Sequence, residues 1–286
     1  LGRTRDLTLT PYLSPATRTI EARYRQAFLQ GDLALRGAVT RDDLLPDALR
    51  GYVRAEGRFE PGAGVILTFD LAAVSDDSYL SDYGHSDGDR LESTVRLERA
   101  TADSLLLGDI AVVRSFRDDE ATESLSPILG GLSWDRRRTA WGGTLAWGAE
   151  AEGHVRPEDG EGEAARDALR LGAFADWRGG RILGPGLLVE GQARLDLDAW
   201  RIGDDPAWPD PLLRAAPAAA ATLRFPLVRR GERVSDLLEP VLSFGWAAAL
   251  GDAPPDEDSR LAELDGGNLF ALDRLPGEDR VEEGAR

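Results

Sequence analysis

Apolar and polar residues alternate strictly along most of this chain, in segments that often reach about ten residues or more. Residues 187–198 show the pattern most clearly. One side carries Leu187, Val189, Ala193 and Leu195, and the other carries Glu190, Gln192, Arg194 and Asp196. A period of two residues is typical of β-strands, whose side chains point alternately to opposite faces of a sheet. We therefore expect about thirteen strands and almost no helix.

The length of these segments separates two kinds of β-protein. Strands in soluble sheets average roughly 5 to 6 residues, whereas a tilted strand that crosses a bilayer needs about 9 to 11. The segments at 49–59 and 187–198 reach the longer range. The pattern favours a transmembrane barrel, and a soluble β-sandwich is the alternative.

The predicted connections between strands alternate in length along the chain. Short ones are expected at 30–32, 61–64, 100–103, 136–139, 178–186 and 229–236, and longer ones at 75–89, 117–126, 153–166, 201–213 and after 251. An outer-membrane barrel has short periplasmic turns, long outer loops and aromatic residues near its interfaces. Aromatic residues lie near the short connections, at Phe28, Phe59, Trp134, Trp141, Trp177 and Phe225. We predict an all-β, antiparallel, up-and-down transmembrane outer-membrane β-barrel.

In such a barrel the apolar side of each strand faces lipid and the polar side faces the lumen. We therefore expect six side chains in particular to face the lumen: Arg54, Glu56, Glu190, Gln192, Arg194 and Asp196.

Composition excludes several classes of protein. The chain has 51 acidic and 34 basic residues, a formal charge of −17, and no visible basic cluster, which disfavours nucleic-acid binding. No segment approaches the roughly 18 consecutive apolar residues of a transmembrane helix. The chain has no cysteine, so disulfides and thiolate chemistry are absent. It starts at Leu1 and has no methionine, and we expect it to be a piece of a longer protein.

Motifs for catalysis or metal binding are weak. The two histidines, His85 and His154, fall in predicted long loops, where a solvated histidine is the simplest interpretation. The acidic segment 75–90 lacks the spacing of a calcium-binding EF-hand, which favours a solvated loop over a metal site. We expect the carboxylates of the acidic outer loops to be solvated or to meet divalent cations. We expect no enzymatic activity and no cofactor.

The carboxyl-terminal segment is the most specific motif. An acidic-Asp-Ser element at 256–259 precedes a series of spaced residues. These are Asn268, Leu269, Phe270, Arg274, Gly277, Asp279, Arg280, Glu282, Gly284 and Arg286. The series resembles the signature of the lipopolysaccharide (LPS) assembly family LptD, also called the organic solvent tolerance family. The segments 7–25 and 74–83 are similar to the start of that family's barrel and to its early loop.

The resemblance implies an LPS translocon in the outer membrane of a Gram-negative bacterium, which releases LPS sideways into the outer leaflet. It implies an LptE-type lipoprotein plug and a periplasmic Lpt bridge that docks on a β-jellyroll. Residues 1–286 would be the amino-terminal part of the barrel domain, with the jellyroll and the later strands absent from this chain. A generic outer-membrane pore or barrel adhesin without LPS specificity is the alternative.

The resemblance also implies a lateral gate between the first and last strands of the barrel, and it places Pro11 and Pro15 there. Proline lacks an N–H group and so removes one hydrogen bond from a β-ladder. Without the resemblance, Pro11 is interpreted as an ordinary strand end.

Overall fold

The computed structural model describes residues 2–117, 128–156, 160–257, 268, 271–275 and 277–286. The long strands are β1 (Arg5–Leu13), β2 (Thr17–Phe28), β3 (Gly31–Asp42), β4 (Arg50–Gly62), β5 (Val65–Val74), β6 (Arg90–Ala100), β7 (Ser104–Ser115), β8 (Ile128–Ala140), β9 (Gly143–Val155), β10 (Asp167–Leu183), β11 (Leu187–Gly203), β12 (Leu212–Arg224) and β15 (Val241–Ala247). The shorter elements are α1 (Tyr79–Asp82), β13 (Leu227–Arg230), β14 (Ser235–Leu238), β16 (Leu250–Gly251) and β17 (Gly284–Ala285). Within the described ranges, no helix is long and apolar enough to cross a membrane.

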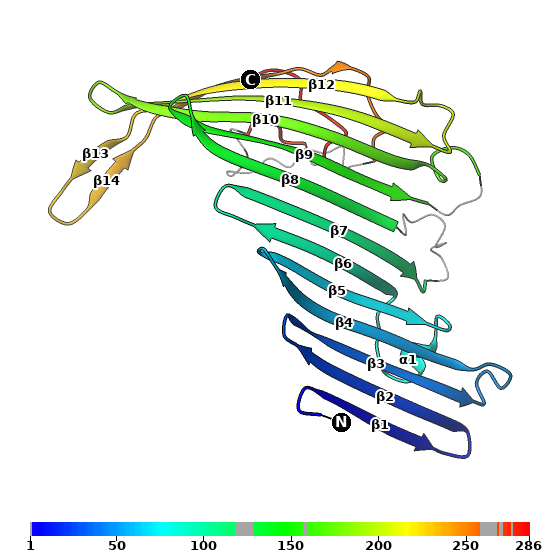
Figure 1. Cartoon of the computed structure of the whole chain (residues 1–286). Helices are drawn as coiled ribbons and strands as arrows, with labels where there is room; N and C mark the ends of the chain where they lie inside the picture. Colours follow the sequence, from blue (N-terminus) through cyan, green and yellow to red (C-terminus); the bar gives the residue numbers. More distant parts are fainter. Residues whose placement is uncertain (1, 118–127, 157–159, 258–267, 269–270, 276) are drawn as a thin grey trace. The chain divides into compact units, whose positions relative to one another are not determined.

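The described strands form one antiparallel, up-and-down sheet of 15 strands, together with the separate hairpin β13–β14 (Figure 1). From β1 to β12 the order in the sheet follows the order in the sequence, and β15 and β17 continue it. Connections at 29–30, 63–64, 101–103, 141–142 and 184–186 are short. The connections that alternate with these, at 43–49, 75–89, 116–127, 156–166 and 204–211, are longer. The first connection of this second set, at 14–16, is the exception and is short. The predicted all-β, up-and-down architecture is confirmed.

Contacts divide the chain into two compact units, residues 1–133 with 152–167 and residues 134–151 with 168–286. In the first unit, strand register gives the sheet an apolar and a polar face. One cross-strand row consists of Leu9, Ala22, Gly37, Val53 and Ala73. The next row, on the opposite face, contains Thr8, Arg23, Arg36 and Arg54. Arg54 and Glu56 therefore lie on the polar face.

The second unit has the same division on β11. Leu195 and Leu197 are 41% and 49% exposed on one side of this strand, whereas Asp198 and Trp200 are buried on the other. Because residues two apart share a face, Glu190, Gln192, Arg194 and Asp196 lie on the side of Asp198. The polar face of each unit is the one predicted to line the lumen.

Three aromatic rings on the apolar face of the first unit pack beside short connections. The ring centroids of Phe28 and Phe59 are 5.6 Å apart, and those of Phe59 and Phe69 are 6.2 Å apart and stacked. Glycine makes this packing possible: a Cβ atom on Gly31 would lie 2.7 Å from Phe59 Cδ1, and one on Gly57 would lie 2.5 Å from Phe69 Cζ. Any side chain at Gly31 or Gly57 would displace a ring.

One predicted turn, at 136–139, is wrong, and two others, at 178–186 and 229–236, are wider than the turns they contain. Residues 136–139 lie inside β8, and the chain turns at Trp141 and Gly142, both with positive φ. Strand β10 continues to Leu183, so 178–183 is strand and the turn is confined to 184–186. Residues 229–236 belong to the hairpin β13–β14, which diverges from the sheet in Figure 1.

Opposite-face substitutions on β11 test which face meets lipid. Arginine on the lipid face near mid-bilayer costs roughly 2–4 kcal/mol. We expect Ala193→Arg to reduce the folded, membrane-inserted fraction of the full-length protein far more than Gln192→Arg at the adjacent position. Heat-modifiable migration on gels would measure that fraction. Equal tolerance at the two positions would contradict the assignment of faces.

Candidate functional site

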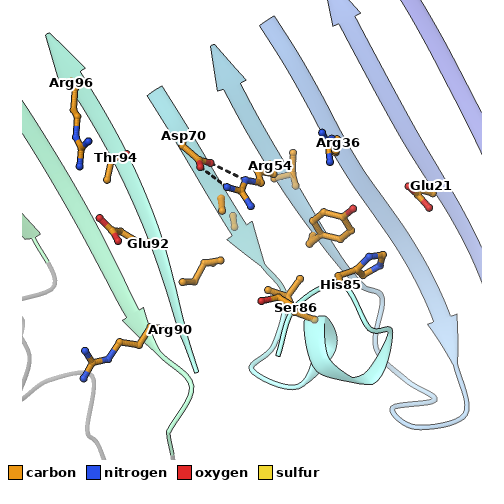
Figure 2. Close-up of a pocket in the computed structure, with 16 residues that line it drawn as sticks. Glu21, Arg36, Arg54, Asp70, His85, Ser86, Arg90, Glu92, Thr94 and Arg96 are labelled. Carbon is orange, nitrogen blue, oxygen red and sulfur yellow. Dashed lines mark hydrogen bonds and ion pairs between the residues drawn. The ribbon is translucent and has the colours of Figure 1, made fainter. Parts of the chain in front are cut away.

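A cavity of about 770 Å³ lies on the polar face of the first unit. Its lining comes from β2 to β6 and from the connection between β5 and β6 (Figure 2). The charged lining residues are Glu21, Arg36, Arg54, Asp70, Arg90, Glu92 and Arg96, and Tyr52 and His85 line the cavity as well. The arginine Nε of Arg54 lies 2.9 Å from Asp70 Oδ1. The cavity is therefore polar and carries charges of both signs.

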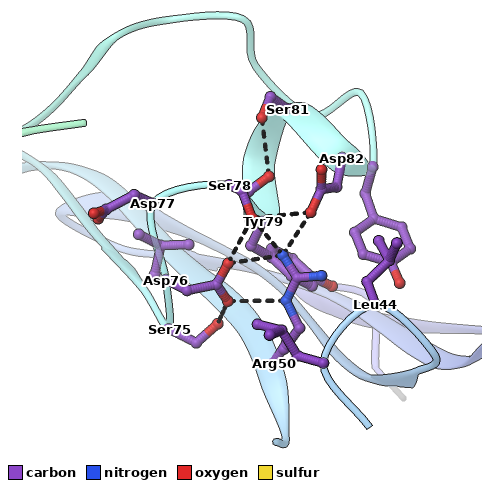
Figure 3. Close-up of polar contacts among 12 residues, drawn as sticks. Leu44, Arg50, Ser75, Asp76, Asp77, Ser78, Tyr79, Ser81 and Asp82 are labelled. Atoms are coloured by element: carbon purple, nitrogen blue, oxygen red, sulfur yellow. Dashed lines mark hydrogen bonds and ion pairs between the residues drawn. The ribbon is translucent and has the colours of Figure 1, made fainter. Parts of the chain in front are cut away.

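The connection at 75–89, which we name the β5–β6 loop, folds back onto the sheet at Arg50. The Arg50 side chain is 1% exposed, and its Nη2 lies 2.7 Å from Asp76 Oδ1 and 2.7 Å from Asp82 Oδ2 (Figure 3). Its Nη1 lies 3.1 Å from Asp42 Oδ2, at the end of β3. One buried guanidinium thus fastens the loop to two strands through three carboxylates. This role of Arg50 could not be recognised in the sequence, because arginines recur all along the polar faces.

Aromatic and hydroxyl groups complete this attachment. The Tyr79 hydroxyl lies 2.7 Å from Thr40 Oγ1, which lies 2.8 Å from Thr19 Oγ1 on β2. The Arg50 guanidinium also packs 5.4 Å from the centroid of the Tyr79 ring. Burial, together with a hydrogen bond that it donates to Asp42, raises the pKa of Tyr83 to about 12. Tyr83 therefore stays a neutral donor at physiological pH.

The sequence suggested that the acidic loop is simply solvated, and the structure shows instead that ion pairs hold it. Hydrogen bonds from Arg50 hold the pKa of Asp76 well below its usual range. Asp77 pairs with Arg114 Nη2 at 2.8 Å on the surface. Among the described residues, no group of three or more His, Asp or Glu side chains is placed to hold a metal ion. The carboxylates of this loop are used mainly to dock it.

In the second unit a buried carboxylate lies between two arginines. Asp198 Oδ1 is 2.8 Å from Arg170 Nη2, and Asp198 Oδ2 is 2.9 Å from Arg214 Nη2; the side chains are 1%, 5% and 4% exposed. The Arg214 guanidinium lies 4.6 Å from the Trp200 ring centroid. Burial raises the pKa of Glu278, whose Oε2 lies 3.4 Å from Arg170 Nη2. In the sequence, Asp198 was distinguished only as part of the alternating segment 187–198, and the other residues of this cluster were not predicted.

The carboxyl-terminal segment 277–286 packs on this arginine pair. Arg214 Nη1 donates to the Asp279 carbonyl at 2.8 Å, and a cavity of about 750 Å³ separates the segment from the polar face of β11 and β12. Arg286 exchanges two backbone hydrogen bonds with Gly245 of β15, at 2.7 and 2.9 Å. The segment thus ends as an added strand, β17.

Several residues of the carboxyl-terminal motif contact one another. Arg274 Nε donates to Glu282 Oε2 at 2.8 Å, and Arg286 Nη1 donates to the Glu282 carbonyl at 2.9 Å. Gly284 has a φ of +107°, a backbone conformation that favours glycine. Gly277, Asp279 and Arg280 line or border the same cavity. Leu269 and Phe270 lie outside the described residues, and Asn268 accepts a backbone bond from Ala271.

The predicted gate residues lie at the start of the chain, away from these clusters in the sequence. Pro11 is inside β1, opposite Ile20 of β2, and Pro15 is in the connection at 14–16. One histidine differs from expectation: His154 lies in a strand, whereas His85 is exposed in the β5–β6 loop, as predicted. His154 is within β9, and its Nε2 lies 3.2 Å from the Arg166 carbonyl, while the His85 ring lies 4.6 Å from the Tyr52 ring.

Comparison with known families then identifies the chain. A family model described as LptD, LPS transport system D, matches residues 49–286, which include the β5–β6 loop and the carboxyl-terminal segment. The search of curated proteins returned no match. LptD is a transport and assembly family and not an enzyme family. The match covers most of the sequence, so this chain belongs to the LptD family, with a role in LPS transport and assembly at the outer membrane.

Proposed function

We propose that this chain forms part of the wall of an outer-membrane barrel that releases LPS sideways into the outer leaflet. In this proposal, residues 1–286 are the amino-terminal part of the barrel domain in a Gram-negative outer membrane. The partners are LPS itself, an LptE-type lipoprotein plug and a periplasmic Lpt bridge that docks on a jellyroll. Family membership supports the LPS substrate, and the geometry of β1 supports lateral release.

The proposal rests on which edge of β1 lacks a hydrogen-bond donor because of Pro11. Ser14 N donates to Thr17 O and Ala27 N donates to Thr4 O, both at 2.8 Å. In an antiparallel pair, alternate residues exchange hydrogen bonds with the partner strand. Even-numbered residues of β1 therefore bond to β2, and odd-numbered residues point their N–H groups to the other edge.

Pro11 belongs to the odd-numbered set, so its lost donor leaves the β1–β2 ladder intact. The loss falls on the edge of β1 that has no neighbour among the described strands. A closing strand would pair at that edge and would find one hydrogen bond fewer there. A seam weakened in this way opens more easily, while the adjoining strand pair stays firm. Pro15 lies in the connection 14–16 and would affect only the position at which β1 ends.

Restoring the donor tests lateral release in the full-length protein. Pro11→Ala adds a hydrogen bond worth about 0.5–1.5 kcal/mol to the seam. We expect slower appearance of LPS at the cell surface and higher sensitivity to large antibiotics. Pro61→Ala, at a register irregularity near the end of β4, is the control and should leave both unchanged. Normal surface LPS and a normal barrier in Pro11→Ala cells would contradict a gating role.

A further inference from the structure

Three arginines lie directly opposite one another on the polar face of the first unit. Arg23 of β2 pairs in register with Arg36 of β3, and Arg36 pairs with Arg54 of β4. We name these three residues the arginine row. Directly opposite side chains on neighbouring strands have Cβ atoms about 4.5–5.5 Å apart, and like charges in that position destabilise the sheet. The sheet therefore keeps an arrangement that works against its own stability.

Acidic side chains neutralise only one end of the row. Arg54 contacts Asp70 and also Glu56, whose Oε1 lies 3.0 Å from Arg54 Nε. Within the part of the chain that the structure describes, Arg23 and Arg36 make no ion pair and no side-chain hydrogen bond. By contrast, Arg25, two residues beyond Arg23 on the same face, pairs with Asp6 at 2.9 Å. Arg23 and Arg36 are thus left without an ion pair in a chain whose net charge is −17. Glu21, two residues from Arg23 on the same face, lines the cavity with Arg36 but, among the described contacts, pairs with neither arginine.

The row leads out of the 770 Å³ cavity. Arg36 and Arg54 line the cavity, with Arg96 on its far side (Figure 2). Arg23 continues the row beyond the cavity, and Thr8 of β1 lies opposite Arg23. The β5–β6 loop borders the same space through His85 and Ser86, and Arg50 fixes that loop. The β5–β6 loop therefore forms a fixed wall of the cavity, and the arginine row extends from the cavity to the strand next to β1.

Adjacent guanidinium groups are well suited to bind phosphate. Each guanidinium presents a planar fork of N–H donors that matches two phosphate oxygens, and charge-assisted hydrogen bonds of this kind are the strong ones. A cavity of this volume falls within the range of about 300–1,000 Å³ for small-ligand sites. A phosphate group supplies the negatively charged partner that Arg23 and Arg36 lack, and its oxygens match the positions of their N–H donors.

We propose that the arginine row binds the phosphate groups of LPS on the polar face, next to the first strand. The inference rests on the proposed function and adds to it the residues that hold the substrate. Free inorganic phosphate has the same chemistry, and the experiment separates the two sources.

The experiment measures equilibrium binding to the purified full-length protein in detergent, with its lipoprotein partner. The probes are phosphorylated LPS, the same LPS after phosphatase treatment, and inorganic phosphate. For Arg23→Gln/Arg36→Gln we expect affinity for phosphorylated LPS to fall at least about tenfold, since two charge-assisted contacts are lost. Phosphatase-treated LPS should bind wild type and variant equally weakly. Arg36→Lys should lose less than Arg36→Gln.

Arg25→Gln is the matched control, because it removes an arginine from the same face of the same strand but from an existing ion pair. It should bind phosphorylated LPS within about twofold of wild type. Equal binding of phosphorylated and treated LPS by the wild type would overturn the inference, and this arm needs no variant to fold. Inorganic phosphate binding as tightly as LPS would also overturn the assignment to the lipid.

Failure of the proposed function gives a different result. If the wild-type complex binds neither form of LPS and its depletion leaves surface LPS unchanged, LPS assembly itself is excluded. If wild type binds and exports LPS while the double variant does so equally well, only the arginine row is excluded.

Discussion

Replacing Arg50 with methionine should release the β5–β6 loop from the sheet. Three carboxylates converge on this guanidinium, and Asp42 is as deeply buried as Arg50 itself, at 1% exposure of the side chain. Removing one partner of a buried pair typically costs about 3–5 kcal/mol, because the remaining charge stays buried without compensation. Asp42 would keep its bonds from Leu44 N and Leu45 N but would lose its only cation among the described contacts.

The measurement is cleavage of the loop by a protease that cuts before aspartate, applied to intact cells that express the full-length protein. The loop of Arg50→Met should be cut rapidly at sites that wild type protects. Arg114→Met is the matched control, since it removes an exposed partner, 43% accessible, of the same loop. Exposed pairs contribute about 0–1 kcal/mol, so its loop should stay protected. Equal protection of Arg50→Met and wild type would show that other contacts hold the loop.

Replacing Asp198 with alanine should have an effect of similar size in the second unit. It would leave Arg170 and Arg214 buried beside each other without the carboxylate that separates them. The expected loss is about 3–5 kcal/mol of stability, and the segment 277–286 should loosen because Arg214 holds the Asp279 carbonyl. Asp198→Asn keeps a hydrogen-bond acceptor but no charge, so we expect an intermediate loss.

Thermal unfolding of the purified full-length protein measures this effect, and trypsin cleavage at Arg280 reports on the segment. Asp196→Ala is the control on the same face of the same strand. Its carboxylate is 17% exposed and pairs with Arg194, which is 30% exposed. We expect a loss of about 1 kcal/mol or less there. Losses of equal size at Asp196 and Asp198 would mean that burial of the arginine pair does not set the cost.

Alternation predicted the strands well because burial on one face of a sheet acts on every second residue. Residues 187–198 lie inside β11 with the faces expected from their sequence. Turn positions were harder to predict. The run Arg136, Arg137, Arg138 suggested a turn, yet β8 continues through it, and the chain reverses only at Trp141 and Gly142. A charged run is compatible with either structure, since arginine side chains reach solvent from a strand as well as from a loop.

The attachment of the loops could not be predicted from the sequence. Asp76 and Asp82 have the composition of a solvated loop, and what makes them structural is Arg50, which is 26 and 32 residues away. Nothing at position 50 distinguishes it from Arg54 or Arg58, which remain half-exposed on the same strand. Long-range partners of this kind depend on strand register, and register is fixed by the folded sheet.

The hairpin β13–β14 is a branch from the sheet rather than a part of it. Arg224 of β12 pairs directly with Val241 of β15, and Phe225 N donates to Pro240 O at 3.1 Å. The hydrogen-bond ladder between β12 and β15 therefore continues to the base of the hairpin. Lengthening such a closed excursion costs little, about 0.6 kcal/mol for each doubling of its length. An epitope tag inserted near Glu232 would therefore leave the register of the neighbouring strands unchanged. The hairpin can thus change in length without disturbing the sheet, and a label at this point would report on the intact protein.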